Sequence, residues 1–263
     1  MSFDLPEETN NAIKRIAGLN DNTVVVLYTG GGKNISSWND EVEAILYSWY
    51  PGQIGNKAIA EIIAGKTNPS GKLPITIEHD FKDSPGYPYI PEGEELYTGW
   101  ELDFDMDHPI HDVDYTEGIF VGYRWYEHKN IEPLYPFGYG LSYSTFEYAN
   151  LMTSAESYNR GEDVLVKVDI TNRSEVAGKE TVQLYVKDLE ASVDRPVKEL
   201  KDFRKVELQA GETKTVHFTL LDRDFAFWDE NKREWIIEPG NFEIQVGASS
   251  ADIRLKNAII TLK

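Results

Sequence analysis

Alternating carboxylates in Asp103–Asp107 have the spacing that most resembles a known ligand set. An EF-hand calcium loop takes oxygen ligands from positions 1, 3 and 5, as here, but it also needs Gly at position 6 and a bidentate Glu at position 12. This chain has His108 and Asp114 at those two places. The pattern therefore argues against an EF-hand, leaves open a looser cation site that includes His108 or His111, and predicts no defined metal ligand.

Motifs for nucleophilic chemistry and phosphate binding are weak or absent. The chain has no cysteine, which excludes disulfides, thiolate metal sites and thiol catalysis. It has no Gly-x-Ser-x-Gly elbow, and its five histidines stand in polar contexts that suit solvated or structural roles. Gly30–Gly32 follows an apolar run but lacks both the spaced glycines of a dinucleotide site and the Gly-Lys-Ser/Thr ending of a triphosphate loop. We therefore predict a structural turn there.

The 45 acidic residues are a further source of candidate acids, bases and nucleophiles, but their number alone identifies none of them. Ten fall in the stretch 92–117, which has no Lys or Arg and is predicted to be a solvated acidic loop. Glu117, beside an aromatic run, is the most prominent single candidate. A structural carboxylate bonded to the backbone or to Arg124 accounts for it better than a direct catalytic role.

The overall charge limits the partners of the chain. With 26 basic residues against 45 acidic ones, its formal net charge is −19 and its sequence pI is about 4.6. Such a surface repels phosphate backbones and anionic headgroups, so we expect neither nucleic acid nor a membrane as partner. No apolar run approaches the roughly 20 residues of a membrane helix, and Met1–Leu5 shows no signal segment, so we expect a soluble protein and favour the cytoplasm.

The sequence predicts two domains, over 1–148 and 149–263. Residues 1–150 carry 24 acidic and 9 basic side chains, against 21 and 17 in 151–263. Helical and extended signals alternate in the first 77 residues, which predicts an α/β sandwich domain with an open, mostly parallel sheet. Residues 78–148 are predicted to be mostly loop. The expected helices begin at Pro6 and span 54–64, and the expected strands span 23–28, 44–49 and 73–77.

After Tyr148 the hydrophobic period changes to 2. Apolar and polar residues alternate over 164–170, 182–186 and 216–220, and turn signals separate these runs. About seven strands without a helix are expected in this domain. This pattern is typical of an all-β, immunoglobulin-like sandwich of the fibronectin type III kind.

Several sequence blocks, in order along the chain, resemble one family. They are Trp49–Gln53 (WYPGQ), Thr67–Pro74 (TNPSGKLP), Glu117–Tyr126 running into Pro133–Tyr143, and Gly240–Leu255. Together these blocks resemble the C-terminal part of glycoside hydrolase family 3, the β-glucosidase and β-xylosidase group, with its fibronectin type III-like domain.

The resemblance implies a three-part enzyme with an N-terminal (β/α)8 barrel, an α/β sandwich and the fibronectin-like module. A barrel needs about 250 residues, and this chain begins inside the sandwich. The barrel with its nucleophilic aspartate, and the loop with the acid/base glutamate, are therefore expected to have no counterpart here. The implied function is that of the C-terminal part of a retaining β-glycosidase, most of all a β-glucosidase, which acts on terminal non-reducing β-linked sugars without a metal or organic cofactor.

On this basis we predict no catalytic residue in the chain and no activity of the isolated chain. Tyr97 and Trp100, set in the acidic loop, are the candidates for substrate-proximal residues at the rim of an active site in the barrel. The expected partners are the barrel, in the same or a separate chain, and a β-glucoside or related carbohydrate. Self-association through the barrel-facing surface is also expected. The alternative is a non-enzymatic carbohydrate-binding or interaction module.

Overall fold

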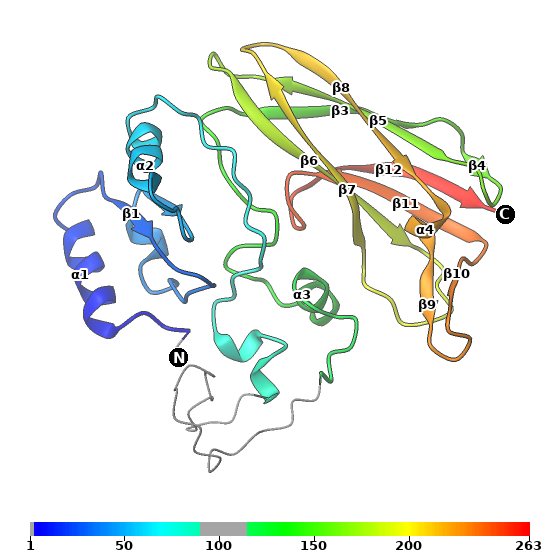
Figure 1. Ribbon diagram of the computed structural model, residues 1–263, viewed down its shortest axis with the longest axis horizontal. Helices are drawn as coiled ribbons and strands as arrows, with labels where there is room; N and C mark the ends of the chain where they lie inside the picture. The colour runs from blue at the N-terminus through cyan, green and yellow to red at the C-terminus, as the bar shows by residue number, and fades with distance from the viewer. Residues whose placement is uncertain (1–2, 90–114) are drawn as a thin grey trace. The chain divides into compact units, whose positions relative to one another are not determined.

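The computed structural model describes residues 3–89 and 115–263, and the chain divides into two compact units (Figure 1). Unit 1 combines Met1–Gly52 with Ile77–Leu134, and unit 2 combines Gln53–Thr76 with Tyr135–Lys263. The chain therefore enters unit 2 twice. The domain boundary predicted at residue 148 stays a prediction, because a division by packing does not test where a family domain ends. Among the described residues, no helix combines the length and apolarity needed to cross a membrane.

Unit 1 begins with helix α1, Glu7–Ala17, for reasons that are visible in its sequence. Pro6 is its N-cap residue, acidic side chains occupy the first turn and basic side chains the last, which complements the helix dipole. The remaining elements of the unit are short. They are β1 (Val24–Leu27), the 3-10 turns η1 (Asn39–Glu41), η2 (Phe81–Asp83) and η3 (Tyr87–Tyr89), β2 (Ala44–Tyr47) and α3 (Tyr123–Lys129).

The described part of unit 1 contains a parallel sheet of two strands, β1 and β2, paired in the register Val24 with Ala44. Both strands are apolar, yet only Leu27 among their residues is buried, and Val24 is 40% exposed. Parallel sheets are normally covered on both faces. Within the described residues this sheet is therefore an incomplete one.

One expectation for the first 148 residues is wrong. Leu73–Ile77 forms no strand: Leu73 exchanges backbone hydrogen bonds with Gly138 and Tyr139, and Pro74 then offers no N–H to continue a ladder. The described part of the segment predicted to be mostly loop does lie mostly outside helices and strands, but it contains the short helix α3, which ends at Asn130 in the left-handed conformation, at φ 54°. Its sequence contains four aromatic or imidazole side chains, which weaken the helical signal.

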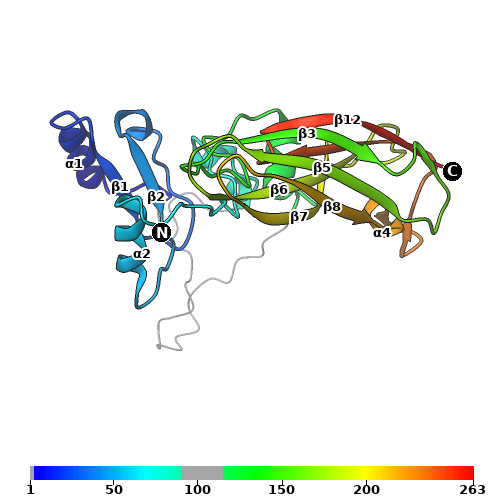
Figure 2. The same ribbon diagram turned by 90° about the horizontal axis from the view of Figure 1, so that it is seen from above.

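Unit 2 is a β-sandwich with a few helical segments (Figure 1, Figure 2). Helix α2 spans Gly55–Ile63, and α4, a single helical turn, spans Asp222–Phe225. Because α4 lies within residues 149–263, the expectation that this second domain has no helix is wrong. The five-stranded sheet, in spatial order, consists of β4 (Ser157–Tyr158), β12 (Ile253–Leu262), β11 (Gly240–Gly247), β6 (Gly178–Asp188) and β7 (Glu199–Leu208). The three-stranded sheet consists of β3 (Phe146–Thr153), β5 (Val164–Asn172) and β8 (Thr213–Leu220), and a separate hairpin is formed by β9 (Phe227–Asp229) and β10 (Glu234–Ile236).

The core of the sandwich follows from the period of 2. In β5 and β8 the buried residues alternate with exposed or half-buried ones, so each strand turns one apolar row inward. Strand β6 is buried at most of its positions, because it lies between β11 and β7 within its sheet. One hydrophobic cluster joins both sheets, and it includes Val166, Phe218, Leu184, Ile244 and Ile260.

The amide of Asn68 ties the first visit of the chain to unit 2 to the second. Its Nδ2 donates to Ser144 Oγ at 2.9 Å and to the carbonyl oxygen of Ala177 at 2.9 Å. Its Oδ1 accepts from Ser142 Oγ at 2.8 Å and from the backbone N–H of Tyr143 at 2.9 Å. Both donors and both acceptor positions of this side chain are thus used. Asn68 holds the loop before β3 and the loop before β6 in one arrangement.

We expect Asn68→Ala to destabilise unit 2 by about 2 kcal/mol, because it removes four hydrogen bonds from a half-buried site. Gln209→Ala is the matched control, since Gln209 is an exposed turn residue and its loss should change stability by less than about 0.5 kcal/mol. Urea unfolding followed by tryptophan fluorescence measures both. Equal midpoints for the two variants would contradict the structural role of Asn68.

Candidate functional site

Most of the residues singled out as sequence candidates lie outside the described residues. Tyr97 and Trp100 are among them, as are Asp103–Asp107 and the neighbouring histidines. Their roles therefore stay predictions. In the two described ranges, 3–89 and 115–263, no three His, Asp or Glu side chains gather in a way that could hold a metal ion.

The described carboxylates of unit 1 include two that are buried. Glu117 is only 9% exposed, and its structural role stays a prediction. Glu78 is 7% exposed and accepts a hydrogen bond from the Tyr126 hydroxyl, which in turn accepts one from Ser84. Burial raises the pKa of Glu78, and burial together with the negative charge of Glu78 raises the pKa of Tyr126. This hydrogen-bonded chain fixes η2 against α3.

Gly30–Gly32 is a structural turn. The carbonyl oxygen of Gly31 accepts hydrogen bonds from Tyr47 Oη at 2.8 Å and from Thr29 Oγ1 at 3.1 Å. At Gly30 a Cβ atom would lie 2.1 Å from the hydroxyl oxygen of Tyr50, so a larger residue would displace the exposed side chain of Tyr50. Burial raises the pKa of Tyr47 to about 12, which keeps its hydroxyl protonated as a donor. The contacts are those of a packed turn rather than of a phosphate loop.

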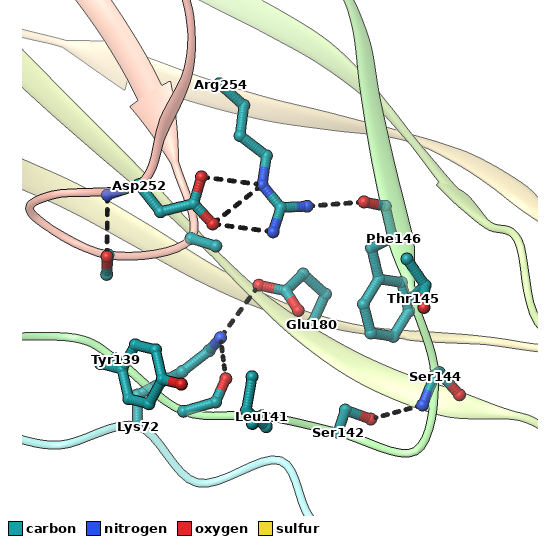
Figure 3. Close-up of a pocket in the computed structure, with 13 residues that line it drawn as sticks. Lys72, Tyr139, Leu141, Ser142, Ser144, Thr145, Phe146, Glu180, Asp252 and Arg254 are labelled. Atoms are coloured by element: carbon teal, nitrogen blue, oxygen red, sulfur yellow. Dashed lines mark hydrogen bonds and ion pairs between the residues drawn. The ribbon is translucent and has the colours of Figure 1, made fainter. Parts of the chain in front are cut away.

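Unit 2 contains a polar pocket with a cavity of about 190 Å³ (Figure 3). Its lining comes from four places in the chain: the segment that holds Lys72, the loop 139–146, strand β6 at Glu180, and the turn and strand start at 248–254. The lining includes serine hydroxyls, two carboxylates and two cationic groups. This concentration of charge makes the pocket a candidate site.

One side of the pocket is a buried ion pair. Lys72 Nζ lies 3.4 Å from Glu180 Oε1 and donates to the carbonyl oxygen of Gly140 at 2.9 Å. The two charged side chains are 14% and 6% exposed. Tyr148 Oη donates to the same carboxylate at 3.0 Å, and burial followed by the charge of Glu180 raises the pKa of this tyrosine well above its ordinary value. The carboxylate of Glu180 is therefore paired with the ammonium group of Lys72 and accepts a hydrogen bond from Tyr148.

The other side of the pocket is formed by Arg254. Its guanidinium lies against the Asp252 carboxylate, at 2.8 Å from Nη2 to Oδ2, and its Nη1 donates to the carbonyl oxygen of Phe146 at 2.6 Å. The same guanidinium stacks over the Tyr148 ring, with 4.7 Å from its central carbon to the ring centroid. Tyr148 thus links the two ion pairs, and Figure 3 shows both pairs on the lining of one cavity.

The charged groups of this pocket connect separate segments of the chain, and we call the cluster of Asn68, Lys72, Glu180 and Arg254 the joint. Each carboxylate of the pocket has a cationic partner, and each cationic group also donates to a backbone carbonyl oxygen. None of these side chains is therefore presented as a free acid, base or nucleophile. The bonds to carbonyl oxygens connect segments that are more than 60 residues apart in sequence. Sequence reasoning missed this cluster because Lys72, Glu180 and Arg254 have no local spacing that relates them.

Removal of only one of the two charges of the Lys72–Glu180 pair should lower the stability of the protein. We expect Lys72→Met to destabilise the protein by about 3 kcal/mol, because it leaves a buried carboxylate without its cation. The double variant Lys72→Met/Glu180→Gln should be more stable than Lys72→Met. The reason is that the amide oxygen of the substituted side chain still accepts from Tyr148 without carrying a charge.

The matched control is Lys57→Met, which breaks the exposed pair with Glu61 on α2 and should cost less than about 0.5 kcal/mol. Denaturant unfolding of all three variants measures these differences. A double variant that is less stable than Lys72→Met alone would contradict the importance of the unpaired charge.

Two family models match the chain. Residues 1–123 match the glycosyl hydrolase family 3 C-terminal domain, and residues 180–250 match a fibronectin type III-like domain. The two matches fall in the order that the sequence blocks predicted.

Similar proteins extend the match to almost the whole chain. Beta-glucosidase BoGH3A of Bacteroides ovatus is 42% identical over 254 residues, which is 97% of this chain and 32% of that protein. Thermostable beta-glucosidase B of Acetivibrio thermocellus is 42% identical over 98% of this chain and 32% of its own length. An exo-alpha-(1->6)-L-arabinopyranosidase of Bifidobacterium breve is 40% identical over 96% of this chain and 31% of its own length. The chain thus spans about a third of the length of these relatives.

Solved structures show the same arrangement of elements. A GH3 beta-glucosidase of Bifidobacterium adolescentis superimposes with a TM-score of 0.86 at 39% identity, over 99% of this chain and 36% of that one. Beta-glucosidase 3B of Thermotoga neapolitana, in complex with glucose, gives 0.85 at 37% identity, over 98% of this chain and 34% of that one. The predicted fold class, an α/β domain followed by a fibronectin type III-like sandwich, is confirmed. The chain belongs to glycoside hydrolase family 3, and it corresponds to the C-terminal domain of that family together with a fibronectin type III-like domain.

Proposed function

We propose that this chain is the C-terminal region of a retaining β-glucosidase that hydrolyses terminal non-reducing β-linked sugars. The observation that carries the proposal is the match along nearly the whole chain, at 42% identity, to two proteins named as β-glucosidases. Retaining hydrolysis needs a nucleophilic carboxylate and an acid/base carboxyl group about 5–5.5 Å apart. We infer that both come from residues outside this chain, since the matched region is only about a third of each relative.

The incomplete sheet of unit 1 supports a preceding region as the partner of this chain. Strands β1 and β2 are apolar and parallel, but most of their residues are only half-buried: Val24 is 40% exposed, and Tyr28, just after β1, is 53% exposed. A parallel sheet of this kind gains stability when further strands and a second layer cover it. We infer that the barrel-containing part of the enzyme, in the same or a separate chain, supplies that cover. In its absence the same surface would favour self-association.

The contribution of this chain to hydrolysis is then one of support and of substrate contact at a rim. The described ion pairs of unit 2 stabilise the scaffold and take no part in proton transfer. Tyr97 and Trp100 remain our candidates for contacts with the sugar, because aromatic rings present flat apolar faces together with a polar edge.

The isolated chain should show no turnover of an aryl β-glucoside, and addition of a folded N-terminal barrel fragment of the same family should restore activity. The reason is that the two carboxyl groups belong to the rest of the enzyme, whereas the scaffold is here. Release of the aryl alcohol, followed by absorbance, measures both states. Turnover by the pure chain alone would overturn the assignment of both catalytic groups to outside this chain, and a folded complex that stays inactive on every aryl β-glycoside tested would overturn the enzymatic proposal.

In the active complex, Tyr97→Ala and Trp100→Ala should each raise KM about fivefold, which corresponds to about 1 kcal/mol of lost aromatic contact, with a smaller change in kcat. Tyr115→Ala serves as the control, because Tyr115 is an aromatic residue near the C-terminal end of the same loop, is 75% exposed and is not one of our candidates for sugar contact. Steady-state kinetics on one aryl glucoside compares the three variants. Unchanged KM values for both loop variants would remove these residues from the site.

A further inference from the structure

Two tryptophans face each other across the hairpin β9–β10 of unit 2. Trp228 and Trp235 are directly opposite in its register, their ring centroids are 5.4 Å apart, and the rings are inclined at 54°. They are 46% and 45% exposed, so much of each ring remains in contact with water. A cross-strand aromatic pair stabilises a hairpin. That role does not by itself require two of the largest apolar side chains at one exposed place.

The rings are held by their surroundings rather than left free. Arg223, from α4, stacks on Trp235 with its central guanidinium carbon 3.0 Å from the ring centroid. At the tip, Asp229 Oδ1 accepts from the backbone N–H groups of Asn231 and Lys232, at 2.9 and 3.0 Å. The hairpin therefore has a closed, hydrogen-bonded turn and one ring fixed by a planar cation. A surface ordered in advance loses less entropy when it binds.

The base of the hairpin is anchored in a buried charge network. Arg195 pairs with Asp188 at 2.8 Å and with Glu199 at 2.9 Å, and it donates to the carbonyl oxygen of Phe225 at 3.1 Å. The same guanidinium lies 5.7 Å from the centroid of the Phe227 ring, the residue before Trp228. This arrangement connects the hairpin to β6 and β7, so the exposed rings stand on a rigid part of the sandwich.

The charged side chains around the two rings are of both signs. Arg223 lies between Asp222 and Asp224 on α4, and the sequence from Asp229 to Glu234 contributes three acidic and two basic side chains. The two segments together carry five acidic and three basic side chains, so the local sum is −2 in a chain whose formal net charge is −19. Carboxylate, guanidinium and ammonium groups beside flat rings offer many hydrogen-bond donors and acceptors. Such a surface fits an uncharged, polyhydroxylated ligand better than an anionic one.

We propose that Trp228 and Trp235, together with Arg223, form a binding surface for an uncharged polysaccharide chain, a β-linked glucan. The exposed ring faces pack on the apolar C–H faces of the sugar rings, while the charged side chains of the hairpin bond hydroxyl groups. Binding at the hairpin would hold the polymer on the enzyme. The choice of a β-linked glucan as the ligand rests on the proposed function, but the test of this binding surface does not depend on any hydrolytic activity.

The test is native gel electrophoresis of this chain through gels that contain a soluble, uncharged mixed-linkage β-glucan. The wild-type chain should be retarded as the glucan concentration rises. Trp228→Ala and Trp235→Ala should each raise the apparent Kd at least tenfold, and Trp228→Tyr should restore most of the binding because it restores a flat ring. Phe203→Ala is the matched control, since Phe203 is an aromatic residue of β7 that is 57% exposed. It should bind as the wild type does.

Thermal unfolding of each variant shows whether a loss of retardation comes from unfolding, and the comparison of Trp228→Ala with Trp228→Tyr then rests on variants with similar midpoints. The proposal is overturned if the wild-type chain is not retarded, or if both tryptophan variants bind as tightly as Phe203→Ala. The proposal is also overturned if a proline-rich peptide, rather than glucan, protects Trp228 and Trp235 from quenching of their fluorescence by acrylamide. It is overturned as well if an added barrel fragment protects these two tryptophans from acrylamide, because the barrel would then be the partner of this surface. Each of these outcomes leaves the hydrolytic proposal untouched, because none of them measures turnover.

Discussion

The fully bonded amide of Asn68 fixes the two segments of unit 2, 53–76 and 135–263, to each other. Unit 2 is built from two segments of the chain that are separated by more than 50 residues, so specific bonds are needed to hold the two segments in one arrangement. Asn68 provides four of them, to the loops that precede β3 and β6, and it does so with a side chain that has no unused donor or acceptor position. Hydrophobic contacts alone have no direction and would leave the loops free to slide.

The polar pocket continues the same joint by electrostatic means. Four residues beyond Asn68, Lys72 crosses to Glu180 of β6, and Tyr148 of β3 bridges that carboxylate to the guanidinium of Arg254 on β12. A buried charge pair contributes little net stability compared with apolar packing. Removal of one charge of the pair nevertheless lowers the stability strongly, because the other charge is left buried without a partner. The Lys72–Glu180 pair therefore disfavours any arrangement that separates the two charges, while the apolar core of the sandwich supplies most of the stability.

Sequence reasoning found what depends on periodicity and missed what depends on distance along the chain. The alternation in Val164–Ile170 placed β5 correctly, and Pro6 with its acidic neighbours placed the start of α1, because both signals are local. The ion pairs of the pocket join residues far apart in sequence, so no spacing could reveal them. Leu73–Ile77 looked like a strand by composition, although the proline within it removes a ladder bond. The Trp228–Trp235 pair needed the register of a hairpin before the two rings could be related.

The similarity to relatives also limits what this region can determine. Two proteins named as β-glucosidases and one named as an arabinopyranosidase match the same stretch at 42%, 42% and 40% identity. Overall identity over this region therefore does not distinguish between the named activities of these relatives. The joint of Asn68, Lys72 and Glu180 is indifferent to the sugar, because its groups are saturated by one another. The joint therefore holds the segments of unit 2 together and offers no group that could distinguish one sugar from another.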